Sequence, residues 1–224
     1  NLLSNDGIIT IEFPHIMNLI KFNQFDTIYH EHFYYYSLIS ILKILKKFNL
    51  EIFKAEKIST HGGSLRVYVK KNINIHYQIE RSVKDCLEEE KKFGLNDLKI
   101  YKDFQKKVEN VKYEFLKFLL RSKKQNKVVI AYGAAAKGNT LLNYSGVDGD
   151  LIDFVVDKSK IKEGKYLPGS HIPILSEDCI KKVKPDFVII FPWNIKKEIF
   201  EQLSYIRKWK GRFVTFIPKM KIYD

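Results

Sequence analysis

The sequence predicts an α/β protein whose C-terminal part, residues 126–224, is a doubly wound, Rossmann-like parallel sheet. Short apolar runs and helical patterns alternate there, an order typical of a parallel sheet with helices on both faces. The runs that predict buried strands lie at 128–132, 152–156, 187–191 and 213–217. The patterns that predict helices lie between them, at 135–144, 176–184 and 194–208. A turn of small residues, Gly133 to Gly138, joins the first strand to the first helix.

The region before this sheet predicts strands and one helix. A strand is expected at 8–13, and Ser37 is the expected N-cap of a helix with apolar residues at three- and four-residue intervals. Residues 50–58 alternate in part, residues 65–69 alternate strictly, and a Gly-Gly turn separates them. This arrangement predicts a hairpin or two adjacent strands of one sheet.

Residues 77–124 predict a pair of long helices, because they contain no Pro, one Gly and many periodic apolar residues among Glu and Lys. The second helix carries one apolar stripe, formed by Phe104, Val108, Val111, Phe115, Phe118 and Leu119. We expect this stripe to pack against the following sheet, since the repeat lasts too few heptads for a coiled coil. The expected domains are residues 1–75, 76–125 and 126–224.

Composition and charge narrow the class of protein. The 224 residues are 45% hydrophobic, and 39 Lys and Arg against 26 Asp and Glu give a net charge of +13. The lysines are scattered and no nucleic-acid-binding motif occurs, so we expect no nucleic-acid partner. No apolar run approaches the length of a membrane span, so we expect no membrane contact. Cys86 and Cys179 lie far apart in helical segments, which favours a reducing, cytoplasmic location.

The chain opens on Asn1 rather than Met, and residues 3–7 read as the end of a helix and a turn that leads into the first strand. The opening residues also lack the basic-then-apolar order of a signal peptide. We therefore expect the sequence to begin in the middle of a domain, as a truncated protein or the product of a split gene would.

Residues 26–37 concentrate two histidines, a glutamate and four tyrosines in twelve positions. A packed core would not tolerate so many polar and titratable groups without a purpose. Extended backbone would place Tyr29 and Glu31 on one face and His30 and His32 on the other. A histidine beside a carboxylate and a phenol suits proton transfer, because histidine titrates near neutral pH.

A metal site and a satisfied polar turn are the alternatives for this motif. His30-Glu31-His32 is not the HExxH pattern of zinc enzymes, and two ligands from so short a segment would need others from elsewhere in the fold. We therefore expect no metal at this motif. His15, near the end of the first strand, has either a structural role or a place facing a cleft.

Four segments together resemble successive motifs of one enzyme family. In chain order they are Glu12 to His15, Gln24 to His32, Thr60 to Arg66 and Tyr132 to Asn143. The sequence is similar here to the S-adenosylmethionine-dependent sugar-nucleotide C-methyltransferases of deoxysugar pathways. The resemblance covers essentially the whole chain. That family, however, begins with a small cysteine-rich zinc module and a Gly-rich cofactor-binding turn, and neither precedes Asn1 in this sequence.

The resemblance implies that residues 1–75 are the tail of a methyltransferase domain and that the C-terminal sheet binds a nucleotide-linked keto-deoxysugar. The implied cofactor is S-adenosylmethionine, with most of its binding motif in a missing region supplied in cis or by a separate chain. The chain alone would then be inactive. His32 would be the base that forms an enolate, Glu31 its orienting partner, and Tyr29 a donor to the sugar or enolate. The alternative is a noncatalytic nucleotide-sugar- or NAD-binding module that works with a separate subunit.

The turn at 133–138 is the main candidate for binding the substrate, because free N–H groups and the helix dipole attract phosphate where a helix begins. Small residues such as Ala135 allow close approach, Lys137 can donate to an anion, and Asn139 or Thr140 can bind a sugar or phosphate. The alternative is that the turn serves only tight packing of helix on sheet. A lysine inside the turn favours ligand binding.

Three further positions are weighed against structural alternatives. Arg66 follows the Gly-Gly turn, and the paired N–H groups of its guanidinium suit a diphosphate. The alternative is that Arg66 is a surface residue without a ligand. Trp193 follows a strand and can stack on a base or ribose, and Asn194 can cap the next helix. Asp157 follows the second strand of the sheet, where dinucleotide enzymes place the acid that binds the ribose, so NAD is an alternative ligand.

Overall fold

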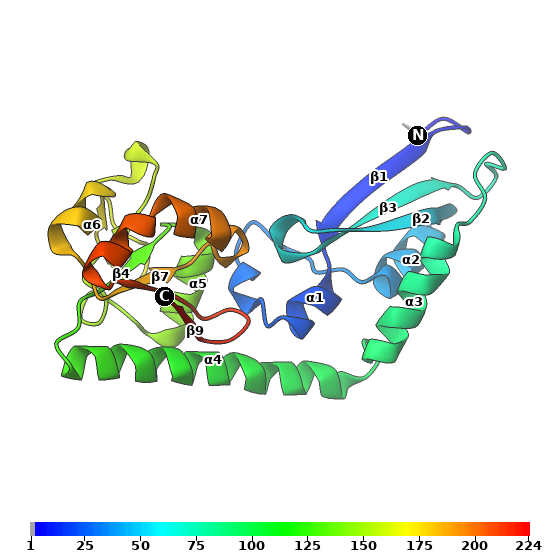
Figure 1. The fold of residues 1–224 in the computed structure, drawn as a ribbon. Coiled ribbons are helices and arrows are strands. Elements are labelled where there is room, and N and C mark those ends of the chain that lie inside the picture. Colours follow the sequence, from blue (N-terminus) through cyan, green and yellow to red (C-terminus); the bar gives the residue numbers. More distant parts are fainter. Residues whose placement is uncertain (1–2) are drawn as a thin grey trace. The chain divides into compact units, whose positions relative to one another are not determined.

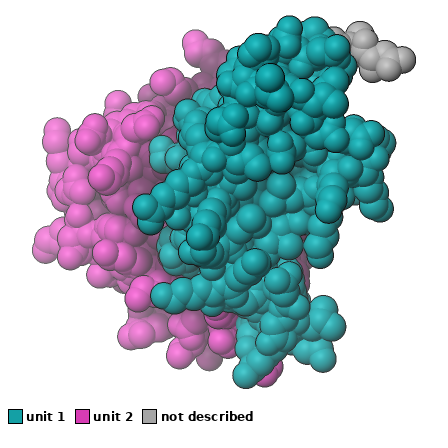
Figure 2. Space-filling view, turned by 90° about the vertical axis from the view of Figure 1, so that its right-hand side faces the viewer, with its two compact units in different colours: residues 1–24, 32–105 teal, residues 25–31, 106–224 magenta. Residues whose placement is uncertain are grey.

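The computed structural model describes residues 3–224, except for the side chain of His61. Asn1, Leu2 and the His61 imidazole of the predicted Gly-rich turn lie outside the described part. The chain divides into two compact units, which Figure 2 distinguishes by colour. Unit 1 consists of residues 1–24 and 32–105, and unit 2 consists of residues 25–31 and 106–224. The division falls inside the polar motif, between Glu31 and His32.

Unit 1 contains a three-stranded antiparallel sheet in the order β1-β3-β2. Its strands are β1 (Ile8–Pro14), β2 (Leu50–Ile58) and β3 (Ser64–Lys71). The pairing of β2 with β3 confirms the hairpin predicted around the Gly-Gly turn. Strict alternation along β3 buries Leu65, Val67 and Val69 completely, while Arg66 and Tyr68 stay partly exposed on the other face.

Helices cover the apolar face of this sheet. They are α2 (Leu38–Lys46) and α3 (Arg81–Phe93), whereas α1 (Ile16–Lys21) and the first turns of α4 (Leu98–Lys124) pack together in a separate apolar cluster. Figure 1 shows α2 and α3 beside the sheet, and Ile41 and Val83 from these helices join the strand residues in one apolar cluster. Ser37 caps α2 as predicted, because its hydroxyl accepts from the Ser40 N–H.

A buried carboxylate connects three elements of unit 1. Glu90 on α3 is fully buried, and its two oxygens accept from the N–H groups of Leu38 (2.5 Å) and Ile39 (2.8 Å) at the start of α2. The His15 Nε2 atom, at the end of β1, lies 2.7 Å from the same carboxylate. His15 is 1% exposed, so of its two expected roles the structure shows the structural one.

Unit 2 contains a six-stranded sheet in the order β6-β5-β4-β7-β8-β9. Its strands are β4 (Val129–Tyr132), β5 (Val155–Val156), β6 (Ile174–Leu175), β7 (Phe187–Ile190), β8 (Arg212–Thr215) and β9 (Lys221–Tyr223). All pairs from β6 to β8 are parallel, and β9 alone is antiparallel. The strand order runs outward from β4 in both directions, which confirms the doubly wound α/β fold.

Helices cover both faces of this sheet. They are α5 (Ala136–Ser145), α6 (Asp178–Val183), α7 (Lys196–Gln202) and residues 106–124 of α4. Figure 1 shows α6 and α7 on one side and α4 and α5 on the other. Phe118 of α4 packs edge-on against Phe187 of β7, with 5.1 Å between ring centroids, which confirms the expected packing for this part of the apolar stripe. Phe104, at the other end of the stripe, packs in unit 1 instead. Among the helices described, none is long and apolar enough to cross a membrane.

Candidate functional site

The carboxyl ends of β4, β5 and β7 meet at one edge of the sheet in unit 2. Gly133 follows β4, Asp157 follows β5, and Phe191 with Pro192 follows β7. From β4 the chain continues to β5 and β6 on one side, and it then returns to β7 and β8 on the other side of β4. Open α/β sheets bind ligands at the point where the strand order changes direction in this way. The predicted turn at 133–138 therefore lies where the fold favours a site.

The glycines of this turn serve close packing. Gly133 has a φ of +95°, and a Cβ atom there would lie 2.5 Å from Pro192. A Cβ atom on Gly138 would lie 2.4 Å from the ring of Phe191, which is itself buried. Packing thus explains both glycines, and the case for a ligand depends on the side chains around them.

Replacing Gly138 with Ala should lower the free energy of unfolding by about 1 to 3 kcal/mol, because the added methyl group overlaps the Phe191 ring. Denaturant unfolding of the purified chain measures this loss. The matched control is Gly149→Ala, since a Cβ atom at Gly149 would meet nothing within 4 Å. Equal stability of the two variants would contradict the tight contact.

Lys137, in the first turn of α5, is half-buried at this edge. Its Nζ atom donates to the Asn194 Oδ1 atom at 2.7 Å and lies 4.5 Å from the centre of the Trp193 ring. Burial lowers the pKa of Lys137, and the negative charge of Asp26 opposes this shift. Among the described residues, no carboxylate lies within ion-pair distance of Lys137. The structure thus presents a cation without a direct counter-ion at a helix N-terminus.

The predicted capping role of Asn194 is wrong. The N-cap of α7 is Ile195, because residues 193–195 form a single 3₁₀ turn before the helix starts. The Asn194 side chain is directed to Lys137 instead. The structure therefore brings together Lys137 and Trp193, which were predicted as separate candidates, with Asn194 as a third member.

The other residues predicted in the turn differ in what they can offer a ligand. Ala135 is the N-cap of α5 and provides no side-chain cap, so the first N–H groups of the helix remain available. The Thr140 hydroxyl donates to the Ala136 carbonyl at 3.1 Å, within its own helix. The Oδ1 atom of Asn139 is buried and accepts no hydrogen bond within the described part of the chain. This unused acceptor of Asn139 is shielded from solvent, so a ligand would reach it only after the side chain turned outward.

Asp26 belongs to this site, although sequence reasoning did not single it out. It lies in a 3₁₀ turn at Phe25–Thr27, is 2% exposed, and its Oδ2 atom accepts from the Trp193 Nε1–H at 2.6 Å. Phe25 packs against Tyr144 of α5, with 5.4 Å between ring centroids. These contacts attach the first half of the polar motif to unit 2.

The motif continues from Asp26 as an irregular segment. Tyr29 is half-buried, and burial raises its pKa, with smaller contributions from the charges of Glu31 and Asp26. His30 and Glu31 are exposed. His32 begins the part of the motif that belongs to unit 1, where it is half-buried and its ring centroid lies 6.3 Å from that of Tyr35. The proton-transfer roles of these residues remain predictions.

Arg66 is engaged within unit 1. Its Nη2 and Nε atoms donate to the Glu12 Oε2 atom on the neighbouring strand, at 2.9 and 3.3 Å. The Thr60 hydroxyl donates to the other Glu12 oxygen at 3.0 Å. A diphosphate would have to compete with Glu12 for this fork, which weakens the case for Arg66 as a ligand-binding residue.

The geometry around Asp157 weakens the case for NAD. One carboxylate oxygen accepts from the Ala134 N–H at 2.8 Å and from Lys162 at 3.1 Å, and the other accepts from the Ser159 N–H at 2.8 Å. Lys162 also donates to the Ala134 carbonyl at 2.9 Å. Asp157 therefore fixes the turn after β4, whereas a ribose-binding acid needs free acceptor sites.

A buried group in unit 1 has the composition of a metal site. Potential ligand atoms of His15, Cys86 and Glu90 lie within 4.8 Å of one another. However, the Glu90 oxygens already accept from the start of α2 and contact His15, and burial raises the pKa of Cys86 to about 12. We interpret this group as a structural hydrogen-bond cluster.

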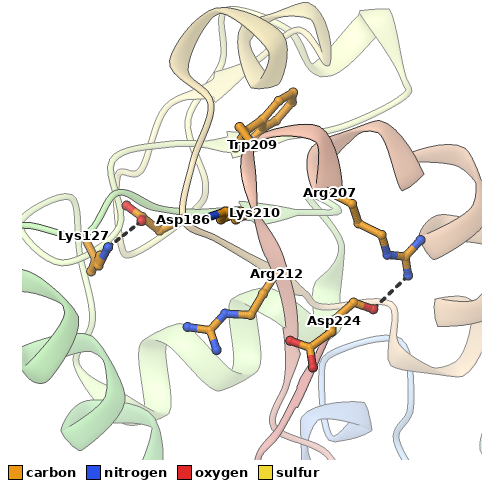
Figure 3. A pocket seen from close by; sticks show the side chains of 8 residues that line it. Lys127, Asp186, Arg207, Trp209, Lys210, Arg212 and Asp224 are labelled. Atoms are coloured by element: carbon orange, nitrogen blue, oxygen red, sulfur yellow. Dashed lines mark hydrogen bonds and ion pairs between the residues drawn. The ribbon is translucent and has the colours of Figure 1, made fainter.

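A hollow of about 600 Å³ lies at the opposite, amino edge of the unit 2 sheet (Figure 3). Its basic lining is partly engaged already, because Lys127 forms an ion pair with Asp186 at 2.8 Å and Arg207 donates to the Asp224 carbonyl at 3.1 Å. Arg212, at the start of β8, also lines it. Ligands of open α/β sheets bind at the carboxyl edge, so we place the candidate site at the start of α5.

Comparison with known proteins assigns the family. Residues 59–218 match the family described as C-methyltransferase C-terminal domain, which is more than half of the chain. The chain belongs to this family. The matched region contains the turn at 133–138 and Trp193, and this membership confirms the C-methyltransferase resemblance predicted from the four motifs.

The chain is also similar to the C-methyltransferase NovU of Streptomyces niveus. The two are 33% identical over 221 residues, which cover 99% of this chain and 52% of NovU. The chain thus spans about half the length of the curated relative it matches.

Proposed function

We propose that this chain is the C-terminal portion of an S-adenosylmethionine-dependent C-methyltransferase that acts on a nucleotide-linked keto-deoxysugar. In this proposal the carboxyl edge of unit 2 binds the nucleotide diphosphate, and residues 29–32 act on the sugar. Membership of the C-methyltransferase family supports the reaction type. The observation that carries the substrate class is Lys137, a half-buried cation without a direct counter-ion at the start of α5.

The chemistry requires a base and a stabilised enolate. A carbon next to a carbonyl loses a proton when a base is held close to it and a donor stabilises the developing oxyanion. We assign the base to His32, its orientation to Glu31, and donation to the sugar or enolate oxygen to Tyr29. The raised pKa of Tyr29 keeps its hydroxyl protonated, as a donor must be.

S-adenosylmethionine, when bound, supplies the electrophilic methyl group. Unit 1 provides no binding site for it, because none of the strands β1 to β3 is followed by a Gly-rich turn that opens a helix, and this proposal assigns the turn after β4 in unit 2 to the nucleotide diphosphate. We infer that a further region, in cis or as a separate chain, provides this site. The edge of β1 supports the inference, since within the described residues β1 pairs only with β3 and can accept another strand.

Replacing Lys137 with Ala should weaken binding of a nucleoside diphosphate by about 10- to 100-fold, because one charge-assisted contact is lost. Calorimetric titration into wild type and variant measures the change, with S-adenosylmethionine and NAD titrated in parallel.

The matched control is Lys210→Ala, which removes one positive charge at the amino edge of the same unit. Its affinity for the diphosphate should equal that of wild type. If Lys137→Ala binds the diphosphate as tightly as wild type does, the turn at 133–138 has only a packing role. A loss confined to Lys210→Ala would move the ligand to the hollow of Figure 3, and tight NAD binding would favour the dinucleotide alternative.

A further inference from the structure

Asp26 is a buried acid beside the proposed anion site. Only its Oδ2 atom has a hydrogen bond, from the Trp193 Nε1–H at 2.6 Å, and its Oδ1 atom is buried with no partner among the described residues. The same indole carries the Lys137 ammonium group over its face, 4.5 Å from the ring centre. One edge of Trp193 thus contacts the acid while its face contacts the cation.

This environment disfavours the ionised form of Asp26. A carboxylate removed from water needs a close counter-ion or several strong donors. Asp26 has the Trp193 indole, smaller contributions from the backbone N–H groups of Asp26 and Thr27, and no ion-pair partner within the described residues. Burial accordingly raises the pKa of Asp26 from 3.8 to about 7, although the Trp193 hydrogen bond and the Lys137 charge both lower it. Both protonation states are therefore present near neutral pH.

A bound diphosphate would change this balance. The charged and titratable groups that interact with Asp26 are Lys137 on α5 and Tyr29 on its own segment, while the 3₁₀ turn at 193–195 contributes only the neutral indole. An anion on Lys137 neutralises the charge that favours the carboxylate and adds negative charge nearby. The protonated form of Asp26 is then favoured.

We propose that Asp26 is an affinity-determining residue, whose ionised fraction takes up a proton when a diphosphate binds at Lys137 and the start of α5. The inference rests on the proposed function of this turn and goes beyond it, because it makes ligand affinity depend on an acid that is shielded from the ligand. Asp26 acts here through its charge and does not contact the ligand.

The test is calorimetric titration of UDP-glucose and its thymidine counterpart into the purified chain, because a diesterified diphosphate keeps its charge across the neutral range. The dissociation constant should be about tenfold larger at about pH 8 than at about pH 6, since only the protonated fraction of Asp26 binds well. Titration in two buffers of different ionisation enthalpy should show net proton uptake near pH 7.

The isosteric variant Asp26→Asn should bind with the same affinity at both pH values, at the level of wild type near pH 6, and without proton uptake. Loss of folding is not expected. Because the folded-state pKa of Asp26 is raised, its contribution to stability is lost as pH rises from about 4 through about 7, so the amide should be at least as stable at about pH 8. Thermal unfolding checks this.

A second variant, Trp193→Phe, keeps a ring beneath Lys137 but removes the donor to Asp26. The pH at which affinity falls should therefore move upward. A wild-type affinity that is the same at both pH values would overturn the inference and leave the proposed function standing. The same pH dependence in Asp26→Asn would also overturn it and would point to Lys137 as the titrating group. Absence of diphosphate binding to wild type at either pH would overturn both proposals.

Discussion

In the full-length enzyme proposed above, replacing His32, the proposed base, with Asn should lower turnover by about 10² to 10⁴-fold, the usual contribution of a general base. Affinity for the nucleotide sugar should change by no more than a few fold, because the proposed diphosphate contacts are made by unit 2, whereas His32 belongs to unit 1. Steady-state kinetics with the N-terminal region present, in cis or co-expressed, separate the two effects as kcat and KM. Exchange of the acidic carbon-bound proton with deuterated solvent should be lost together with turnover.

The matched control is His30→Asn, which changes an exposed histidine of the same motif. It should keep turnover and exchange within a few fold of wild type. If His32→Asn exchanges the proton at the wild-type rate, the base is another residue. If His30→Asn loses the solvent exchange of this proton instead, His30 is the base.

The parts of the fold that could be predicted from the sequence are those whose pattern is set locally. The runs at 128–132 and 187–191 are apolar throughout, as strands covered on both faces must be, and they became β4 and β7. The Ser37 cap is a local hydrogen bond and was predicted for the same reason. By contrast, α1, β6 and β9 are six, two and three residues long, too short to show a period, and they depend on their neighbours.

The candidate site shows the same limit. The location of the turn at 133–138 follows from strand, turn and helix order, and Lys137 could be chosen because its charge is unusual in a tight turn. Asp26 could not be recognised, because its hydrogen-bond partner Trp193 is 167 positions away in the sequence and an aspartate in a polar motif resembles any turn residue.

Replacing Glu90 with Ala should lower the free energy of unfolding by about 3 to 5 kcal/mol, as expected when one partner of a buried polar pair is removed. The substitution leaves the N–H groups of Leu38 and Ile39 without their acceptor at the start of α2, and it leaves His15 without its partner at the end of β1. Each such buried group costs about 1 to 3 kcal/mol. Urea unfolding followed by circular dichroism measures the loss.

The control for this prediction is the adjacent Glu89→Ala, because Glu89 pairs with Lys57 on the exposed side of α3. An exposed ion pair contributes about 0 to 1 kcal/mol, so this variant should unfold nearly as wild type does. If Glu90→Ala does not fold at all, Glu90→Gln gives an intermediate case, since a carbonyl oxygen in the Oε1 position keeps the contacts with Leu38 and His15 while the amide group opposes the Ile39 N–H. Equal losses in the Glu89 and Glu90 variants would contradict the structural role of the buried carboxylate.

A chelator tests whether His15, Cys86 and Glu90 hold a metal instead. If it lowers the stability of wild type and not that of Glu90→Ala, a metal among these residues is favoured, since the structural cluster needs none.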